Sequence, residues 1–248
     1  MTQILDGAMV DDSRPSGNGS LVQRAVQAVT DHIRLKAMRV GDTLPGEKHF
    51  ADTLGVSRAV VREAFGALAA LRLIDVGNGR RAKVGAIDGS VIATSLDHAV
   101  STAQITIPEV WDVRRTIELR TAALAASSRT RAEADEIVRL AEAMSAANGD
   151  LAKICQHDIA FHEAIARASH NGLFVQIVSS FGPLMEVAVP SAWGTRVTEV
   201  ERQVMLARHL AVARAIADGD PIAAAGEMDA HFDASIRDIF ESTARPIR

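Results

Sequence analysis

The strongest constraint on the fold of this chain is the order of segments between residues 20 and 85. Apolar residues recur at helical spacing up to about Met38, and a turn marked by Gly and Pro follows. A second, short helix is expected from Glu47 to about Leu54, and Gly55 suits the position just past its end. The segment therefore opens with two helices separated by a turn.

A third helix and a hairpin complete this pattern. Ser57 suits the N-cap of the third helix, whose apolar positions form one stripe. The stripe consists of Val60, Val61, Ala64, Phe65, Leu68 and Leu71. Beyond it, Ile74, Val76 and Val84 flank the run GNGRRAK, which predicts a short β-hairpin with glycines at the turn. This order of elements is that of a winged helix-turn-helix.

Basic side chains lie where such a fold would meet DNA. Arg58 and Arg62 are four residues apart near the start of the third helix, where a recognition helix contacts bases and phosphates. Arg80, Arg81 and Lys83 follow at the hairpin with no acidic residue among them, which suits a wing on the phosphate backbone. Two arginines on a helix are also common on a solvated face, but the hairpin and the helix order favour DNA binding.

Charge and cysteine content narrow the class of protein further. Residues 1–85 hold 12 Lys and Arg against 9 Asp and Glu, whereas the remainder holds 15 against 22. Such asymmetry is typical of a chain with one nucleic-acid-binding end. Cys155 is the single cysteine, which fits a reducing cytoplasm. Neither a signal peptide nor an apolar run of ~20 residues is visible, so we expect a cytoplasmic protein without a membrane segment.

The rest of the chain predicts helices. Alanine and leucine dominate, aromatic residues make up only 4%, and no convincing strand follows residue 105. We expect a flexible tail (1–19), a winged helix-turn-helix domain (20–85), a linker with one short helix (86–104) and a helical domain (105–243). The fold class is therefore mainly α, with an N-terminal winged helix-turn-helix and a C-terminal all-helical bundle.

Capping patterns divide the helical domain into six expected helices. Pro108 suits a first turn, Asp150 suits an N-cap, and Asn171-Gly172 marks a break. Two capping boxes and an Asp-Pro start provide the other signals: Thr130 with Glu133, Thr198 with Glu201, and Asp220-Pro221. One helix is expected from Leu173 towards Val189, with PSAWGT as a loop. Trp193 in that loop is interpreted as a packing residue.

Four residues of this domain could together hold a divalent metal: Asp158, His162, His209 and His231. Asp158 and His162 are four residues apart, so both side chains leave the same face of one helix. One carboxylate and three imidazoles suit Zn, Ni, Co, Fe or Mn. From spacing alone, such histidines are more often ordinary surface or core residues, and the other five histidines have no comparable partner.

The N-terminal segment resembles the GntR family of bacterial regulators. The run LPGEKHFADTLGVSRAVVREAFGALAALRLIDV carries the resemblance, which extends over about residues 20–84. It implies that Lys48, Arg58, Arg62 and the wing at Asn78 and Gly79 touch DNA. We add Ser57 and Arg80 to this set, from the cap and the basic wing. Gly46 departs from the usual Ser or Ala of the family, and Arg81 replaces a common glycine.

The helical half resembles the FCD domain of the FadR branch of that family. The runs VWDVRRTIELRTAALAA, HDIAFHEAIARASHNGLF and RHLAVARAIADGDPIAAAGEMDAHF carry the resemblance over about residues 105–243. It implies that the four candidate ligands hold a metal and that Arg114 pairs with a carboxylate effector. Glu118 lies one turn further on the same face. Asn171 matches a family asparagine that could bond the effector, although a helix cap explains it equally well.

These observations predict a transcription regulator, not an enzyme. A homodimer would bind a pseudo-palindromic operator, and a small organic or sugar acid at the metal, with Zn as the first candidate, would control DNA affinity. A metal-independent acyl-CoA sensor is the main alternative, but it does not need the four-ligand set. A metalloenzyme is another, but it gains nothing from a basic wing. A third is an architectural DNA-binding protein without a ligand, which the polar residues expected to face the interior of the bundle disfavour.

Overall fold

The computed structural model describes residues 17–77, 79–147, 149–196 and 198–243, with side chains from Leu21 to Ser235. The chain divides into two compact units, Met1–Ile87 and Asp88–Arg248. Residues 1–16 of the expected tail lie outside the described residues, and residues 17–19 already belong to the first helix. The first helix thus begins three residues before the expected cap at Ser20.

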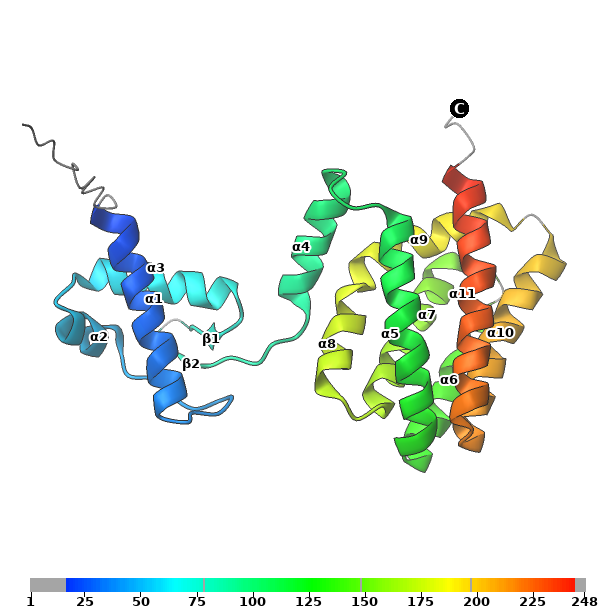
Figure 1. Ribbon diagram of the computed structural model, residues 1–248, viewed down its shortest axis with the longest axis horizontal. Helices are drawn as coiled ribbons and strands as arrows, with labels where there is room; N and C mark the ends of the chain where they lie inside the picture. The colour runs from blue at the N-terminus through cyan, green and yellow to red at the C-terminus, as the bar shows by residue number, and fades with distance from the viewer. Residues whose placement is uncertain (1–16, 78, 148, 197, 244–248) are drawn as a thin grey trace, which may run out of the picture. The chain divides into compact units, whose positions relative to one another are not determined.

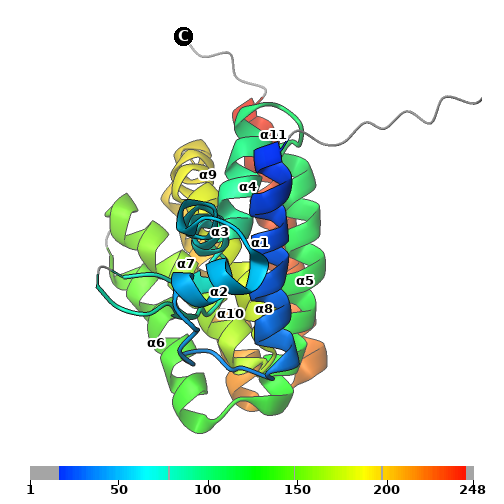
Figure 2. The ribbon, with the colours of Figure 1, turned by 90° about the vertical axis from the view of Figure 1, so that its left-hand side faces the viewer.

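The first unit contains three helices and a two-stranded antiparallel sheet (Figure 1). The elements are α1 (Gly17–Leu35), α2 (Glu47–Leu54), α3 (Arg58–Ala70), β1 (Ile74–Asp75) and β2 (Lys83–Val84). In the sheet, Ile74 pairs with Val84 and Asp75 pairs with Lys83. Figure 2 looks along α3 and shows α1 upright beside it, so the two helices cross. The winged helix-turn-helix is confirmed.

Local sequence signals explain the turn between α2 and α3. Gly55 ends α2 with a φ of 65°, the left-handed conformation that glycine adopts without steric cost. The Ser57 side chain then accepts a hydrogen bond from the backbone N–H of Val60 and caps α3. The apolar stripe of α3 is buried except for Leu71, which follows the last turn and is exposed. The turn and the cap therefore fix the direction in which α3 leaves α2.

The second unit is a bundle of helices (Figure 1). Its elements are α4 (Ser90–Ser101), α5 (Ile107–Ser128), α6 (Arg131–Ala146), α7 (Leu151–Ala168), α8 (Gly172–Ser180), α9 (Gly182–Thr195), α10 (Glu199–Asp218) and α11 (Pro221–Thr243). Helix α5 packs against α7, α10 and α11, and α6 packs against α7 and α10. The core between them consists mostly of Ala, Leu, Ile and Met side chains, with a few aromatic rings.

The expected caps form in the structure. Thr130 and Glu133 make a capping box at α6, Thr198 and Glu201 make one at α10, and Asp150 caps α7. A further capping box, Thr106 with Glu109, begins α5 just before Pro108. Reciprocal bonds of this kind satisfy backbone N–H groups that the first helical turn leaves without partners.

Residues 86–104 contain the one short helix expected in the linker, but this helix belongs to the second unit. Twelve of them form α4, and α4 packs against α8 and α9 as part of the second unit. Gly89 begins this helix with a φ of 78°, and a Cβ there would lie 2.6 Å from the backbone oxygen of Gln176. The close approach of α4 to α8 therefore requires glycine at this position.

The region after Asn171 also differs from expectation. Two helices, α8 and α9, replace the single helix, and they bend by 52° at Phe181. The expected loop PSAWGT is helical instead, because α9 continues through Pro190 to Thr195. Buried side chains on that last stretch, Ala192 and Trp193, pack into the bundle and hold the helix past its proline. The described part of this domain thus has seven helices from α5 on, not six.

Among the described residues, no single helix is long and apolar enough to cross a membrane. Helices α8 and α9 reach that length and hydropathy only as a bent pair, and α9 buries Leu184, Met185 and Ala188 within the bundle.

We predict that Gly89→Ala loosens α4 more than a matched change elsewhere. Gly149 has a similar φ of 82° but open space around it, so Gly149→Ala should cost only the left-handed strain, about 1–2 kcal/mol. Gly89→Ala adds the clash with Gln176. Hydrogen exchange should therefore speed up across Ser90–Ser101 in the Gly89 variant alone. Equal protection of α4 in both variants would contradict the close-approach argument.

Candidate functional site

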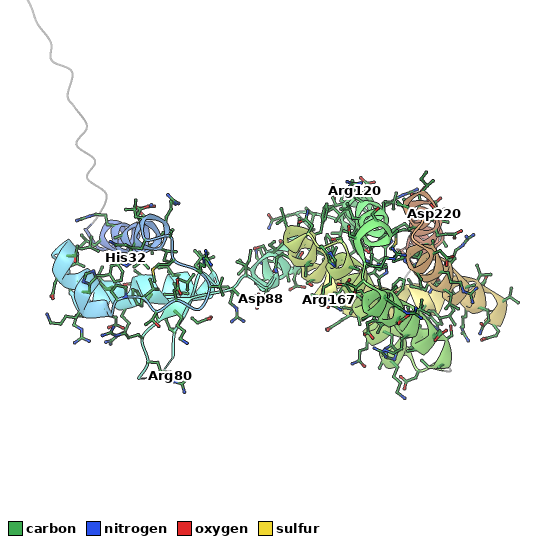
Figure 3. All side chains as sticks on the ribbon, turned by 90° about the horizontal axis from the view of Figure 1, so that it is seen from below. His32, Arg80, Asp88, Arg120, Arg167 and Asp220 are labelled. Atoms are coloured by element: carbon green, nitrogen blue, oxygen red, sulfur yellow. The ribbon has the colours of Figure 1, made fainter. Side chains whose placement is uncertain are left out.

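The first unit has a groove of about 650 Å³ between α3 and the hairpin. Arg58 and Arg62 line it from α3, and Gly79, Arg80 and Arg81 line it from the loop between the strands. The structure thus brings together the basic residues of the helix and of the wing. Figure 3 shows Arg80 at the outer end of the loop, away from the helices. A groove with cations on both walls suits a polyanion.

A carboxylate lies between the two arginines of α3. The Arg62 guanidinium lies 3.2 Å from Glu47, and that of Arg58 lies 3.9 Å from it. The hydrogen bond and the charge of Glu47 raise the pKa of Arg62. Both arginines remain mostly exposed. Glu47 therefore holds them side by side without covering them.

The other predicted DNA-binding residues do not all line this groove. Lys48 is exposed on α2 and pairs with Asp52 at 2.6 Å, outside the groove. Ser57 uses its hydroxyl as the N-cap of α3. Gly79 lies in the wing with a φ of 69°. Asn78 lies outside the described residues.

The second unit brings three histidines from three helices into one buried cluster. His162 on α7, His209 on α10 and His231 on α11 each offer a nitrogen within 4.8 Å of the others. Asp158, one turn before His162, places a carboxylate oxygen 2.9 Å from Nε2 of His209 and 3.9 Å from Nε2 of His162. All four residues that the sequence suggested as ligands therefore meet inside the bundle.

Neighbouring groups fix the orientation of two imidazole rings. Nδ1 of His162 contacts a carboxylate oxygen of Glu118, and Nδ1 of His209 lies 3.0 Å from the carbonyl oxygen of Met205. The Nε2 atoms of both rings consequently face Asp158. Holding one ring nitrogen in this way leaves the other available as a ligand.

The protonation preferences of this cluster suit a metal site. Burial alone would raise the pKa of Asp158, but the hydrogen bond with His209 and the nearby imidazoles lower it instead, so the carboxyl is ionised. Burial and the neighbouring His209 and His162 lower the pKa of His231, which keeps its ring neutral. Nδ1 of His231 is buried and has no hydrogen-bond partner among the described residues. A buried nitrogen without a hydrogen-bond partner is available to bind a metal ion.

Arg114 is buried beside this cluster. Its Nε lies 2.8 Å from Oε1 of Glu118, and its guanidinium also contacts the sulfur of Met185. Aromatic rings surround the guanidinium, with Trp111 at 4.9 Å and Phe232 at 5.5 Å. Burial alone would raise the pKa of Glu118, but the Arg114 guanidinium and the hydrogen-bonded His162 ring beside it lower the pKa. Arg114 and Glu118 therefore form a buried ion pair whose carboxylate also holds His162.

A cavity of about 30 Å³ lies between Arg114 and the histidine cluster. Arg114, Asp158 and the three histidines line it together with apolar side chains. The other lining residues were not among the sequence-based candidates for the site, and they include Trp111, Trp193, Arg196 and Ser235. No spacing pattern indicates Trp193 or Arg196, because Trp193 belongs to the run PSAWGT expected to be a loop and Arg196 directly follows that run. Glu118 was visible as a carboxylate one turn from Arg114, but its bond to His162 was not.

Two other residues have structural positions. Asn171 is exposed, does not line the cavity, and accepts a hydrogen bond from the backbone N–H of Leu173 as the N-cap of α8. The structure therefore does not bring it to the candidate effector site. Cys155 is buried, and its thiol points to the carbonyl oxygen of Met185. Burial, with the charges of Asp158 and Glu186, raises the pKa of Cys155 to about 11, so it remains a thiol.

Comparison with known proteins gives two family matches. Residues 21–84 match the family described as bacterial regulatory proteins, gntR family, and residues 109–234 match the FCD domain. The two matches fall in the two units of the structure. The family resemblance predicted from the sequence is thereby confirmed for both halves.

Similar proteins carry names of transcription regulators. The Glc operon transcriptional activator of Escherichia coli K12 is 32% identical over 182 residues, covering 71% of this chain and 70% of that protein. The regulator LutR of Bacillus subtilis is 28% identical over 80% of this chain and 92% of its own. A solved structure titled Streptococcus agalactiae GntR shares the fold, with a TM-score of 0.63 and 21% identity over 87% of this chain and 99% of its own.

We predict that the buried carboxylate of Glu118, which pairs with Arg114 on α5, matters far more for stability than the exposed carboxylate of Asp229 on α11, which pairs with the neighbouring Arg115. Glu118→Ala leaves the Arg114 charge buried without its partner, which should cost about 3–5 kcal/mol. Asp229→Ala removes a partner of Arg115 that is 41% exposed, and should cost at most about 1 kcal/mol. Urea unfolding of the two variants checks the difference. Equal losses would show that burial of the pair contributes nothing special.

Proposed function

The chain belongs to the GntR family of bacterial regulatory proteins, and we propose that a small carboxylate bound at a metal ion in its FCD domain controls its affinity for DNA. The family and the winged helix-turn-helix make it a DNA-binding transcription regulator, not an enzyme. The observation that carries the proposal is the cavity in which a buried arginine faces a cluster of three histidines.

The metal would be held by Asp158, His162, His209 and His231. The donor set fits a divalent ion, since the carboxyl is ionised, the His231 ring is neutral, and Nδ1 of His231 has no other partner among the described residues. Zn is the first candidate, with Ni, Co, Fe and Mn as alternatives. When bound, such an ion supplies a Lewis-acid anchor for oxygen donors.

The effector would be a small organic or sugar acid whose carboxylate lies between the metal and Arg114. Arg114 offers a planar guanidinium to the cavity, and Glu118 and the surrounding rings hold it in place. Burying a carboxylate is costly unless charged partners compensate it. The metal ion on one side of the carboxylate and the Arg114 guanidinium on the other would compensate its charge. We leave Asn171 out of this proposal, because it caps α8 on the surface.

DNA would be bound by two copies of the chain. One winged helix reads only a few base pairs, so a homodimer on a pseudo-palindromic operator is expected. Arg58 and Arg62 are proposed to reach base edges in the major groove, helped by Lys48 and the start of α3 at Ser57. Asn78, Gly79 and Arg80 of the wing are proposed to follow the phosphate backbone. Because its proposed partner is double-stranded DNA, we expect the protein to act in the cytoplasm.

Effector binding must favour one arrangement of the DNA-binding units, since a ligand with equal affinity for both arrangements shifts neither. Relatives named as an activator of the Glc operon and as repressors, the NanR proteins, show that proteins similar to this chain act in both directions. Either direction is compatible with the proposed site.

We predict that Arg62→Ala weakens binding to the specific operator by about 1–3 kcal/mol if this side chain bonds a base bidentately. Arg80→Ala should instead weaken binding to operator and unrelated DNA alike, because a phosphate contact carries no sequence information. Electrophoretic mobility shifts on both DNAs measure the two effects. An Arg62→Ala variant that binds its operator as tightly as the wild type would overturn the proposed docking.

We predict that metal and acid binding depend on each other. Metal-loaded protein should bind a carboxylate from a panel of organic and sugar acids, whereas chelator-treated protein should not. Metal bound only to the folded state at a hundred times its Kd adds about 2.7 kcal/mol, so chelation should also lower the Tm of the second unit. Calorimetry and thermal unfolding report both effects.

Two variants serve as controls for this prediction. The His209→Ala, His231→Ala double variant should lose the metal, and chelator should no longer change its Tm. Arg114→Lys keeps a charge beside Glu118 but loses the planar fork, so it should retain the metal and bind the acid at least about tenfold more weakly. Tight binding of a neutral amide or alcohol, unaffected by Arg114→Lys, would exclude the carboxylate model.

A further inference from the structure

One buried polar atom beside the histidine cluster has no role in the function proposed above. Nε1 of Trp111 is buried and has no hydrogen-bond partner among the described residues. The residue as a whole is 4% exposed, so its N–H has little access to bulk solvent. A buried donor without an acceptor costs free energy, and such a group in a folded protein needs an explanation.

The position of the indole ring connects this N–H to the effector cavity. Trp111 lines the cavity of about 30 Å³ together with Arg114, Asp158 and the three histidines. Among the described residues, His231 is the other member of this wall with a buried atom that lacks a partner, and the proposed metal accounts for it. The donor that is left over therefore belongs to the effector site and not to a distant part of the bundle.

Helix α5 places the indole beside the guanidinium that would bind the effector carboxylate. Trp111 and Arg114 are three residues apart on α5, so their side chains leave neighbouring positions on one face of the helix. The guanidinium carbon of Arg114 lies over the Trp111 ring, 4.9 Å from its centre. Arg114 thus covers a face of the indole, whereas the N–H lies in the plane of the ring, at its edge. Contact with Arg114 consequently leaves this N–H able to donate.

The indole N–H can discriminate between ligands, because it is a donor only. It can bond an oxygen of the ligand, but a methyl or methylene group in the same place would leave it buried without a partner. The small cavity and the short distance between Trp111 and Arg114 restrict the acceptor to atoms next to the effector carboxylate. A hydroxyl or oxo oxygen on carbon 2 or carbon 3 of the acid meets this requirement.

We propose that Trp111 is a specificity-determining residue, whose N–H donates a hydrogen bond to a hydroxyl or oxo oxygen on carbon 2 or carbon 3 of the effector acid. This inference rests on the proposed function, because Arg114 and the metal hold the carboxylate of the same ligand. It narrows the effector from acids in general to acids that are oxygenated beside the carboxylate. Acids without that oxygen would leave the donor unpaired and would bind more weakly.

Calorimetry on metal-loaded full-length protein compares acids that differ at this one oxygen. The probes 2-hydroxybutyrate and 3-hydroxybutyrate are matched with 2-methylbutyrate and 3-methylbutyrate, and gluconate is matched with its 2-deoxy and 3-deoxy forms. At least one oxygenated acid should bind at least about fivefold more tightly than its matched acid, as expected for one neutral hydrogen bond. Trp111→Phe keeps an aromatic ring beside Arg114 but removes the N–H, so it should reduce that ratio to near one.

Trp193→Phe is the matched control, since Trp193 also lines the cavity. The chain has two tryptophans, so this variant retains Trp111 alone, and its single indole N–H signal in a proton–nitrogen correlation spectrum reports on Trp111. The preferred oxygenated acid should keep its advantage over the matched acid in this variant. It should also move the indole proton signal downfield, as formation of a hydrogen bond does, whereas the matched acid should not.

The outcomes separate this inference from the function on which it rests. A preference for the oxygen that survives Trp111→Phe would mean that the oxygen contacts the metal instead, and a preference lost equally in both tryptophan variants would mean that general packing of the cavity sets it. Either result, or acids that bind with no such preference and no shift of the indole signal, would overturn the inference and leave the proposed function standing. Failure of every acid to bind metal-loaded protein would overturn both.

Discussion

Arg114 meets Glu118 one turn along α5, and Glu118 in turn contacts Nδ1 of His162 on α7. Each member of this buried chain depends on the next, because a charge without its partner would be costly in the interior. These three contacting side chains orient the His162 ring, keep the Arg114 guanidinium at the cavity and join helices α5 and α7. The site is therefore part of the stability of the bundle, not an addition to its surface.

Local signals in the sequence were sufficient for most of the fold. Gly55 and Ser57 mark the ends of two helices because each satisfies a backbone requirement that few other residues meet. Thr130 with Glu133 and Thr198 with Glu201 act through bonds only three residues apart. Contacts of such short range do not depend on the rest of the molecule, so these helix caps can be predicted from the sequence alone.

Long-range packing decided the features that the sequence left hidden. Pro190 resembles a helix end, yet burial of Ala192 and Trp193 carries α9 past it. The break at Phe181 did have a signal, because Gly182-Pro183 directly follows it. The spacing of four ligand candidates indicated a metal only with the family resemblance, since α7, α10 and α11 bring them together from distant parts of the chain. Arg196 also lines the cavity only because of tertiary packing, since it directly follows the buried end of α9.

Glu47 affects how many counterions would be released when the first unit binds DNA. Because its carboxylate already neutralises part of the charge on Arg58 and Arg62, these arginines do not approach a polyanion as bare cations. Phosphate or base contacts would displace a carboxylate of the protein itself, and the number of small cations released from the DNA would no longer follow from counting basic side chains. The Glu47 side chain would have to move when the protein docks on DNA. The free-energy cost of releasing Arg58 and Arg62 from Glu47 would then be a property of the protein, and DNA sites that contact both arginines would be favoured.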